Sequence, residues 1–221
     1  MEAGAATNGA STSAKKEINR RGREEGRWPS LNSLALMRKA TTPTDISSVD
    51  ITDWCEVKFW VHNKLHKNCF LVLPKAFYIE WGEDKRYWRW ITVKENCFRS
   101  CVDILVPQLL KVSWFLLLGK FKTSALSPQT EYEVAFVVKL VRNDRKWPLP
   151  VNLELDVPNR PKQMRTENLE RKPKEKWIKI RAGEFEMGPE TVGTIVFTLH
   201  ETCQTFKSGL ILKGVLIHPK D

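Results

Sequence analysis

Tryptophans cluster in one short stretch of the 221-residue chain, where three of the nine fall within ten positions. The stretch 77–91 alternates apolar and polar residues on both sides of a polar loop at 82–86, which predicts strand, loop, strand. Trp81 and Trp88 flank the loop, and an exposed indole there can stack on the apolar face of a sugar ring. Trp90 lies deeper in its strand and is expected in the core.

Core packing is the competing interpretation for each of these tryptophans. Tryptophan is highly buried on average, and an alternating aromatic stripe more often faces a core than a ligand. The position of Trp81 and Trp88 beside the loop is what favours a binding role for them.

Motifs for catalysis are absent from the sequence. It contains no glycine-rich nucleotide-binding loop, no HExxH zinc motif and no GxSxG nucleophile elbow. A glycosidase needs two carboxylates on opposite sides of a bond, and nothing in the spacing of Glu83-Asp84 or Glu184-Glu186 brings such a pair together. We therefore interpret the chain as a binding protein without catalytic residues and without a cofactor.

Metal binding is not indicated either. Cys97 and Cys101 are four apart rather than at the spacing of a zinc site, and His62 and His66 lie in a polar connection without a helical pattern. The cysteines are odd in number and lack the spacing of a secreted scaffold, so we expect reduced, intracellular thiols; they lie at positions 55, 69, 97, 101 and 203.

The chain carries a net charge of +10, and the segment 160–179 holds eight basic and three acidic residues. A basic segment of this kind suits RNA or an acidic partner, but also an ordinary solvated loop. Aromatic residues are not interleaved with the lysines except for Trp177, so a stacking platform for bases is not evident. RNA stays open as a partner.

The chain divides into a polar tail at 1–48, with one short amphipathic helix near 31–40, and a domain at 49–221. About ten short alternating strands in the domain predict an all-β fold, a sandwich or a barrel. One helical turn is expected at 102–106 and a long basic loop at 159–175. No signal peptide and no stretch long enough for membrane insertion is visible.

The ordered motifs of the domain resemble the phloem protein 2 lectins of plants, a family also named after the tobacco lectin Nictaba. The match begins with Trp81-Gly82 and Tyr87-Trp88-Arg89-Trp90 and spans about 69–220. Further pieces follow in the same order: Gly119-Lys120, Leu126-Ser127-Pro128, Val138-Lys139-Leu140, Trp177, Gly183-Glu184-Phe185 and Lys207-Ser208-Gly209-Leu210. Each piece is short, and the ordered set is what makes the resemblance specific.

The resemblance implies a jelly-roll-like β-sandwich that binds N-acetylglucosamine oligomers and N-glycan cores. It also implies a homodimer in the cytoplasm and nucleus or in phloem sieve elements. A structural phloem protein that cross-links through its cysteines under oxidant is a further alternative. The implied sugar-binding residues are Trp81, Trp88, Glu201 and Tyr87, with Trp90 and Thr194 as secondary candidates.

Two positions depart from the family pattern. Thr194 stands where a second family glutamate would fall, which would weaken or redirect the choice of sugar. Phe206 stands in place of a tryptophan, a change that we expect to concern packing.

Overall fold

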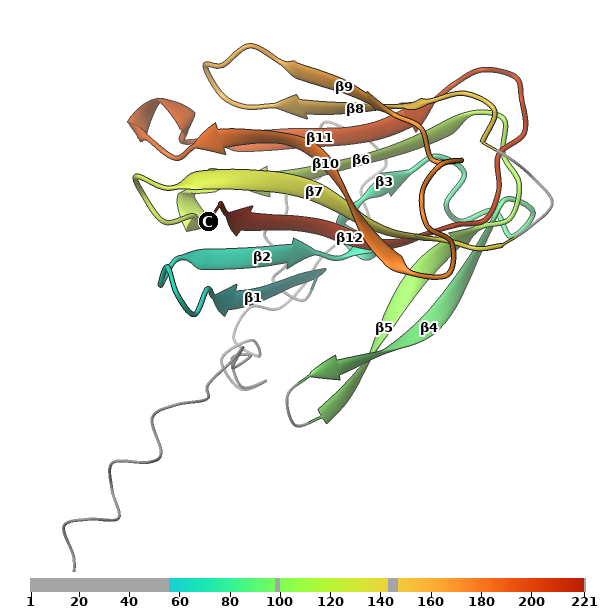
Figure 1. Ribbon diagram of the computed structural model, residues 1–221, viewed down its shortest axis with the longest axis horizontal. Helices are drawn as coiled ribbons and strands as arrows, with labels where there is room; N and C mark the ends of the chain where they lie inside the picture. The colour runs from blue at the N-terminus through green and yellow to red at the C-terminus, as the bar shows by residue number, and fades with distance from the viewer. Residues whose placement is uncertain (1–55, 98–99, 143–146, 221) are drawn as a thin grey trace, which may run out of the picture.

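Two facing β-sheets make up the part of the chain that the computed structural model describes, residues 56–97, 100–142 and 147–220 (Figure 1). The expected tail at 1–48 and its short helix near 31–40 lie outside the described residues. The strands are β1 (Val57–Val61), β2 (Asn68–Val72), β3 (Tyr78–Ile79), β4 (Trp88–Cys97), β5 (Ser100–Leu109), β6 (Phe115–Lys122), β7 (Glu131–Leu140), β8 (Val151–Asp156), β9 (Gln163–Glu167), β10 (Trp177–Glu186), β11 (Thr194–Glu201) and β12 (Leu210–Pro219). Three single turns of 3-10 helix accompany them: η3 (Pro74–Ala76), η4 (Thr123–Ala125) and η5 (Pro189–Thr191).

The larger sheet has seven strands in the order β1-β2-β12-β5-β4, with β7 on the other side of β12 and β10 beside β7. The smaller sheet has five strands in the order β3-β6-β11-β8-β9. The expected all-β sandwich is therefore confirmed, with twelve described strands rather than about ten. Among the described residues no helix is long and apolar enough to cross a bilayer.

The larger sheet divides into two branches at strand β12. One of its edges pairs with β7 along most of its length, while the other pairs with β5 at Ile211 and with β2 at Val215–Ile217. The two partners on this edge continue in different directions, so the β4–β5 hairpin diverges from β1 and β2 (Figure 1).

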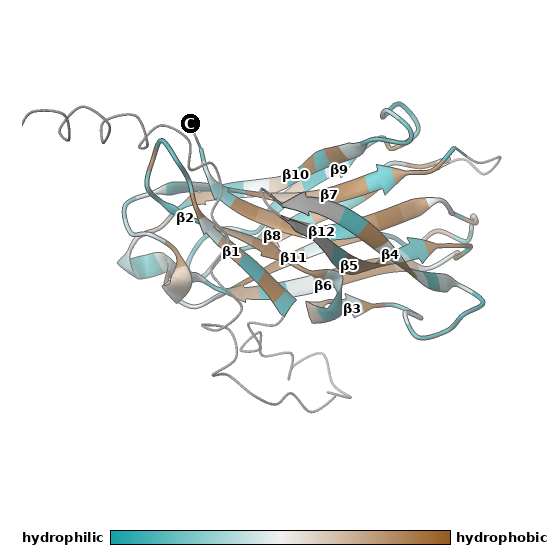
Figure 2. Cartoon of the chain, turned by 90° about the horizontal axis from the view of Figure 1, so that it is seen from below, coloured by the Kyte–Doolittle hydropathy of each residue, from teal (hydrophilic) through white to brown (hydrophobic). Residues whose placement is uncertain are grey.

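The core lies between the sheets, and strands β6, β8 and β11 alternate buried and outward residues accordingly. In β6, for example, Phe115, Leu117 and Phe121 are buried, and the intervening side chains face outward. Phe136 of β7 and Phe197 of β11 meet edge to face with ring centroids 6.1 Å apart, which joins the two sheets. Apolar segments run along strands of both layers in Figure 2.

The tryptophan-rich stretch forms the expected strand, loop and strand, but the two strands do not pair with each other as in a hairpin. Strand β3 pairs with β6 in the smaller sheet, whereas β4 begins at Trp88 and pairs with β5 in the larger sheet. Residues 80–87 therefore cross from one sheet to the other. Alternation identifies extended segments, but it carries no information about the strand with which each one pairs.

Two other expectations are wrong in detail. The helical turn expected at 102–106 is part of strand β5, whose residues pair regularly with β4. The basic loop expected at 159–175 contains β9, an edge strand that pairs with β8. Edge strands are rich in charged residues, which hides them from a pattern of alternating apolar residues.

Strand register brings three connections together at one end of the sandwich. They are 80–87 between β3 and β4, 110–114 between β5 and β6, and 202–209 between β11 and β12. Phe115 at the start of β6 pairs with Glu201 at the end of β11, and Val112 forms a bridge with Lys207. This end of the sandwich carries the candidate site.

Candidate functional site

Trp81 sits at the tip of a tight turn with a left-handed backbone, φ = 59°. The Gly82 N–H donates to the Ile79 carbonyl at 2.8 Å, and the Asp84 N–H donates to the Trp81 carbonyl at 2.9 Å. A left-handed conformation costs a residue with a Cβ roughly 1–2 kcal/mol. Even so, the Trp81 side chain is 53% exposed, so this strained turn presents an indole to solvent.

Two indoles from β4, one buried and one half-buried, hold this turn in place. The Nε1–H of Trp88 donates to the Glu80 carbonyl at 2.9 Å, and the Nε1–H of Trp90 donates to the Gly82 carbonyl at 3.2 Å. The two bonds bracket Trp81 on both sides in the chain. They fix the backbone from which its side chain projects.

The expected exposure of Trp88 is therefore wrong, and Trp90, although it packs against the core as expected, is less deeply buried than Trp88. Trp88 is 2% exposed and stacks on Phe115 in the core, at a centroid distance of 6.3 Å. Trp90 is only partly buried. A buried indole cannot stack on a sugar, so Trp88 supports the turn and does not offer a binding surface. Period-two alternation places the two side chains on one face of β4 but does not say how deeply each is covered.

Tyr87 lies beside Trp81, with ring centroids 5.9 Å apart and planes tilted by 52°. The Arg86 guanidinium lies 5.3 Å above the Tyr87 ring and also forms an ion pair of 2.6 Å with Asp84. Hydrogen bonds from Arg86 hold the pKa of Asp84 below its usual value. The turn thus presents two aromatic rings together with a paired charged donor and acceptor.

The neighbouring connections add further aromatic rings at the same end. The N–H of Leu110 donates to the Tyr87 carbonyl at 2.8 Å, which joins 110–114 to the Trp81 turn. The ammonium of Lys111 lies 4.0 Å from the ring centroid of Phe206. Phe206 is 50% exposed, so its expected packing role is wrong.

Exposed aromatic rings gather at this end of the sandwich. Among the described residues, the large apolar side chains that stand in solvent include only three with an aromatic ring: Trp81, Trp114 and Phe206. All three lie in the connections at this end. We refer to Trp81, Tyr87, Trp114 and Phe206 as the aromatic end.

Glu201 does not face solvent at this end, contrary to its expected role as a sugar ligand. It is 3% exposed and forms an ion pair with the ammonium of Lys207, which is fully buried. Its other carboxylate oxygen accepts from the Cys203 N–H at 2.7 Å. A buried carboxylate with these partners stabilises the 202–209 connection and is not free to bind a ligand.

Lys207 ties that connection to its neighbour. Its ammonium donates to the backbone carbonyls of Ser113 and of Cys203, the latter at 2.7 Å. Burial lowers the pKa of Lys207 to about 8, so the ammonium is still charged at neutral pH. The buried pair therefore positions the two connections that carry Trp114 and Phe206.

Comparison with known proteins identifies the family. The phloem protein 2 family model matches residues 67–219, which include all three connections of the aromatic end. The chain belongs to the phloem protein 2 family. It is 35% identical over 203 residues to Protein PHLOEM PROTEIN 2-LIKE A1 of Arabidopsis thaliana, covering 86% of this chain and 80% of that protein.

A second relative of this phloem protein 2 chain is named for its binding activity. It is a lectin of Luffa acutangula, 36% identical over 165 residues, covering 74% of this chain and 76% of that protein. Among solved structures, the CBM22-1 xylan-binding domain of Paenibacillus barcinonensis Xyn10C aligns with 65% of this chain and 85% of that domain. The identity is 16% and the TM-score 0.37, so this likeness does not bear on the ligand.

Thr194, which stands where the family pattern has a second glutamate, lies far from the aromatic end. Thr194 begins β11 and pairs with Lys122, whereas Glu201 ends the same strand. Seven steps along a strand separate the two by roughly 23 Å. Thr194 is thus excluded from this site of the phloem protein 2 fold.

Sequence reasoning missed Trp114 and Lys111 altogether. Trp114 begins the apolar run 114–118, and the signal that could have separated it from that run is the break in alternation before Phe115. Within the described residues no group of three or more histidine, cysteine or acidic side chains is placed to hold a metal ion. The site of this phloem protein 2 chain is built from aromatic rings, two cationic side chains and loop backbone.

Proposed function

We propose that the chain is a lectin that binds N-acetylglucosamine oligomers and N-glycan cores at its aromatic end. The observation that carries this proposal is Trp81, an exposed indole on a strained turn whose backbone is fixed by two other indoles. Backbone strain is retained where the surrounding structure imposes it, and such positions concentrate at functional sites. Membership of the phloem protein 2 family and the naming of relatives as lectins support the same conclusion.

Stacking supplies the main contact in this proposal. The axial C–H groups of a pyranose ring pack on the face of Trp81, and the tilted ring of Tyr87 provides a second wall for the acetamido methyl group. Arg86 and Asp84 offer a donor and an acceptor to the sugar hydroxyls. The proposal assigns binding contacts and no bond cleavage to these residues, so it describes a binding protein and not an enzyme.

Phe206, Lys111 and Trp114 extend the surface to further sugar units. Two of the three are exposed aromatic rings, and Lys111 adds a donor next to one of them. A shallow site of this kind gains little area for each sugar, so the expected Kd is about 1 µM to 1 mM. A homodimer would raise the avidity for a polymeric glycan without any new contact.

A titration of the full chain with chitotriose tests the proposal. We expect binding by the wild type that changes little between low and high salt, and at least a tenfold loss in Trp81→Ala. Val192→Ala is the matched control, since Val192 is also 53% exposed but follows η5 at the opposite end. Wild-type protein that binds neither chitotriose nor any N-glycan core on an array would overturn the proposal.

RNA binding is a second candidate, favoured by two cation–ring contacts in the larger sheet. The ammonium groups of Lys139 and Lys213 lie 5.0 and 5.3 Å from the ring centroid of Trp177, so an aromatic ring is flanked by cations after all. Its expected signature is an affinity that falls steeply with salt, unlike sugar stacking.

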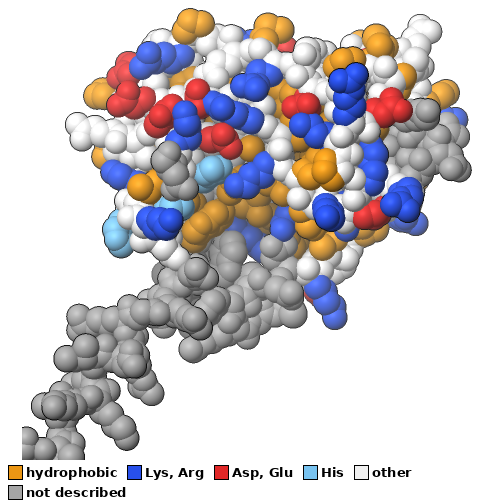
Figure 3. Space-filling model, in the orientation of Figure 1, with side chains coloured by type: hydrophobic (Ala, Val, Ile, Leu, Met, Phe, Trp, Pro, Cys, Tyr) orange, Lys and Arg blue, Asp and Glu red, His pale blue; other side chains and the backbone are white. Residues whose placement is uncertain are grey.

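The basic segment at 160–179 supports RNA less well than its sequence suggests. Three of its cations are already paired with carboxylates: Arg160 with Glu190, Lys162 with Glu154 and Lys172 with Glu167. Basic side chains on the face seen in Figure 3 are likewise interspersed with acidic ones. We therefore rank RNA below sugar as the ligand.

A further inference from the structure

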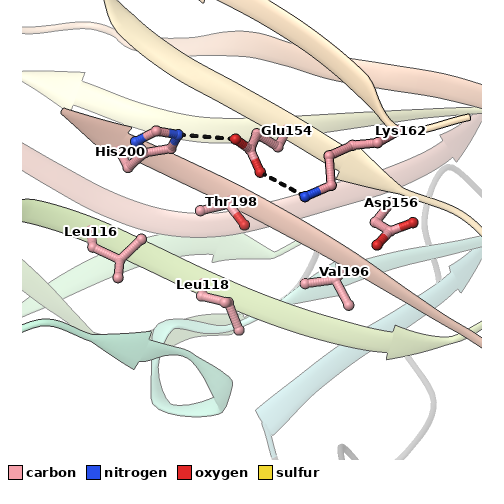
Figure 4. Close-up of a pocket in the computed structure, with 8 residues that line it drawn as sticks. All are labelled: Leu116, Leu118, Glu154, Asp156, Lys162, Val196, Thr198 and His200. Carbon is pink, nitrogen blue, oxygen red and sulfur yellow. Dashed lines mark hydrogen bonds and ion pairs between the residues drawn. The ribbon is translucent and has the colours of Figure 1, made fainter. Parts of the chain in front are cut away.

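The outer face of the five-stranded sheet carries a hollow of about 340 Å³ that the aromatic end does not use (Figure 4). It lies over β6, β11 and β8, the three central strands of that sheet. Three aliphatic and five polar side chains line it. A ligand pocket usually combines an apolar floor with a few polar groups in this way.

The floor of the hollow is aliphatic where a solvent-facing sheet is normally polar. Leu116 and Leu118 of β6 and Val196 of β11 point outward from the core and line the hollow. The unbroken apolar run at 115–118 is explained by this arrangement, since its odd members fill the core and its even members form the floor. Nothing in the core requires leucine at the even positions.

The walls are polar and hold a connected set of donors and acceptors. One oxygen of Glu154 lies 3.2 Å from Nε2 of His200, and the other lies 3.2 Å from the ammonium of Lys162. Asp156 follows two residues later on the same face of β8, roughly 6.5 Å further along. Thr198 adds a hydroxyl between the floor and Glu154.

Register aligns these groups across the strands. Tyr78, Leu118, Thr198 and Glu154 are successive cross-strand neighbours from β3 to β8. With about 4.8 Å between strands, this row spans roughly 14 Å. An extended ligand that lies along this row would meet the aliphatic side chain of Leu118, then the hydroxyl of Thr198, then the carboxylate of Glu154.

We propose that this hollow, which we call the sheet groove, is a second carbohydrate site that binds a neutral oligosaccharide across the strands. The apolar floor suits the C–H face of a sugar, and the wall offers both donors and acceptors to its hydroxyls. Among the lining residues the charges of Glu154 and Lys162 cancel and Asp156 remains, while Lys120 of β6, the cross-strand neighbour of Val196, stands on the same face of the sheet. With neither sign of charge in excess, the hollow suits a neutral ligand better than a polyanion. The proposal does not depend on the aromatic end being active.

A two-site chain of this kind has a functional consequence. One polypeptide would hold two glycan segments at once, one at the aromatic end and one on the sheet groove. It could therefore bridge glycans, or bind one long glycan by both sites, without forming a dimer.

Amide shifts in the full-length labelled protein test the sheet groove. The probes are the hexasaccharides of N-acetylglucosamine, glucose, xylose and mannose, each titrated to millimolar concentration. We expect at least one of them to shift the amides of Leu118, Val196 and Thr198 with saturable binding. The same shifts should persist in Trp81→Ala, which removes the proposed site at the aromatic end.

A pair of threonines supplies the matched control. Thr198 and Thr194 both point outward from β11, but only Thr198 lines the groove. Thr198→Ala should weaken groove binding by about 5–10-fold, the effect of one hydrogen bond, while Thr194→Ala leaves it unchanged. Glu154→Gln should weaken it at least as much, with thermal melting to show that each variant is folded.

The outcomes separate the two sites. Groove amides that stay unshifted with all four sugars, or shifts that are equal in wild type, Thr198→Ala and Glu154→Gln, overturn the second site. If only the amides around Trp81 respond, the sheet groove is refuted and the aromatic end stands. If only groove amides respond, the sheet groove stands and the proposed function of the aromatic end is refuted.

Discussion

The buried indole of Trp88 donates a 2.9 Å hydrogen bond to the backbone carbonyl of Glu80, immediately before the exposed Trp81. This bond connects the core of the sandwich to the turn that carries the proposed sugar platform. Trp88 packs on Phe115, so the position of the turn is set by the same contacts that hold the two sheets together. Two different tryptophans thus carry the two roles: Trp88 the stability of the fold and Trp81 the proposed binding of sugar.

Trp88→Ala should lower the free energy of unfolding by about 3–5 kcal/mol, because it leaves a cavity in the core. It should also weaken chitotriose binding, since the Glu80 carbonyl loses its donor. Urea unfolding of the variant beside Trp81→Ala gives the comparison. Trp81 is 53% exposed, and its replacement should change stability by no more than about 0.5 kcal/mol. Equal stability of the two variants would contradict the assignment of roles.

Glu201→Gln and Lys207→Met should each destabilise the fold by about 3–5 kcal/mol, since either change leaves a buried partner without its counter-charge. The double variant should lose less than the sum of the two, and a double-mutant cycle in urea measures that difference. Single variants with wild-type stability that lose only sugar affinity would instead restore Glu201 as a ligand.

Phe206→Trp should tighten chitohexaose binding by about 2–5-fold, because an indole offers a larger face to the sugar and to the cation of Lys111. Phe206→Ala should weaken binding at this position. Calorimetric titration of both variants checks the direction. An unchanged Kd in both variants would exclude Phe206 from the proposed sugar contacts.

Cys69 and Cys203 should differ in reactivity. Burial raises the pKa of the Cys69 thiol to about 11, so very little thiolate is present at pH 8, whereas Cys203 is exposed. Brief treatment with iodoacetamide at pH 8 should label Cys203 well before Cys69, as read by peptide mass mapping. Because burial raises the pKa of the Cys69 thiol, the protonated thiol favours the folded state below the ordinary thiol pKa. This contribution to the free energy of unfolding is lost as the pH rises toward 11. Rapid labelling of Cys69 in the folded protein at pH 8 would contradict its burial.

Several elements follow from local pattern alone. Apolar residues at every second position of 132–140 and 151–157 predict strands, and β7 and β8 cover these segments except for Val157. Such signals are local because the two sides of a strand meet different surroundings. The ordered short motifs likewise indicate the phloem protein 2 family before any coordinates are known.

What the sequence determined by itself is the all-β class with most of its strands, the family and the presence of Trp81 beside a turn. The tertiary structure alone decided which tryptophan is buried, that Glu201 meets Lys207, and that Trp114 and Phe206 share one end of the sandwich. It also decided that Leu116 and Leu118 form the floor of a hollow. The physical reason is that burial and proximity depend on pairing between distant strands, and alternation along one strand does not encode its partners.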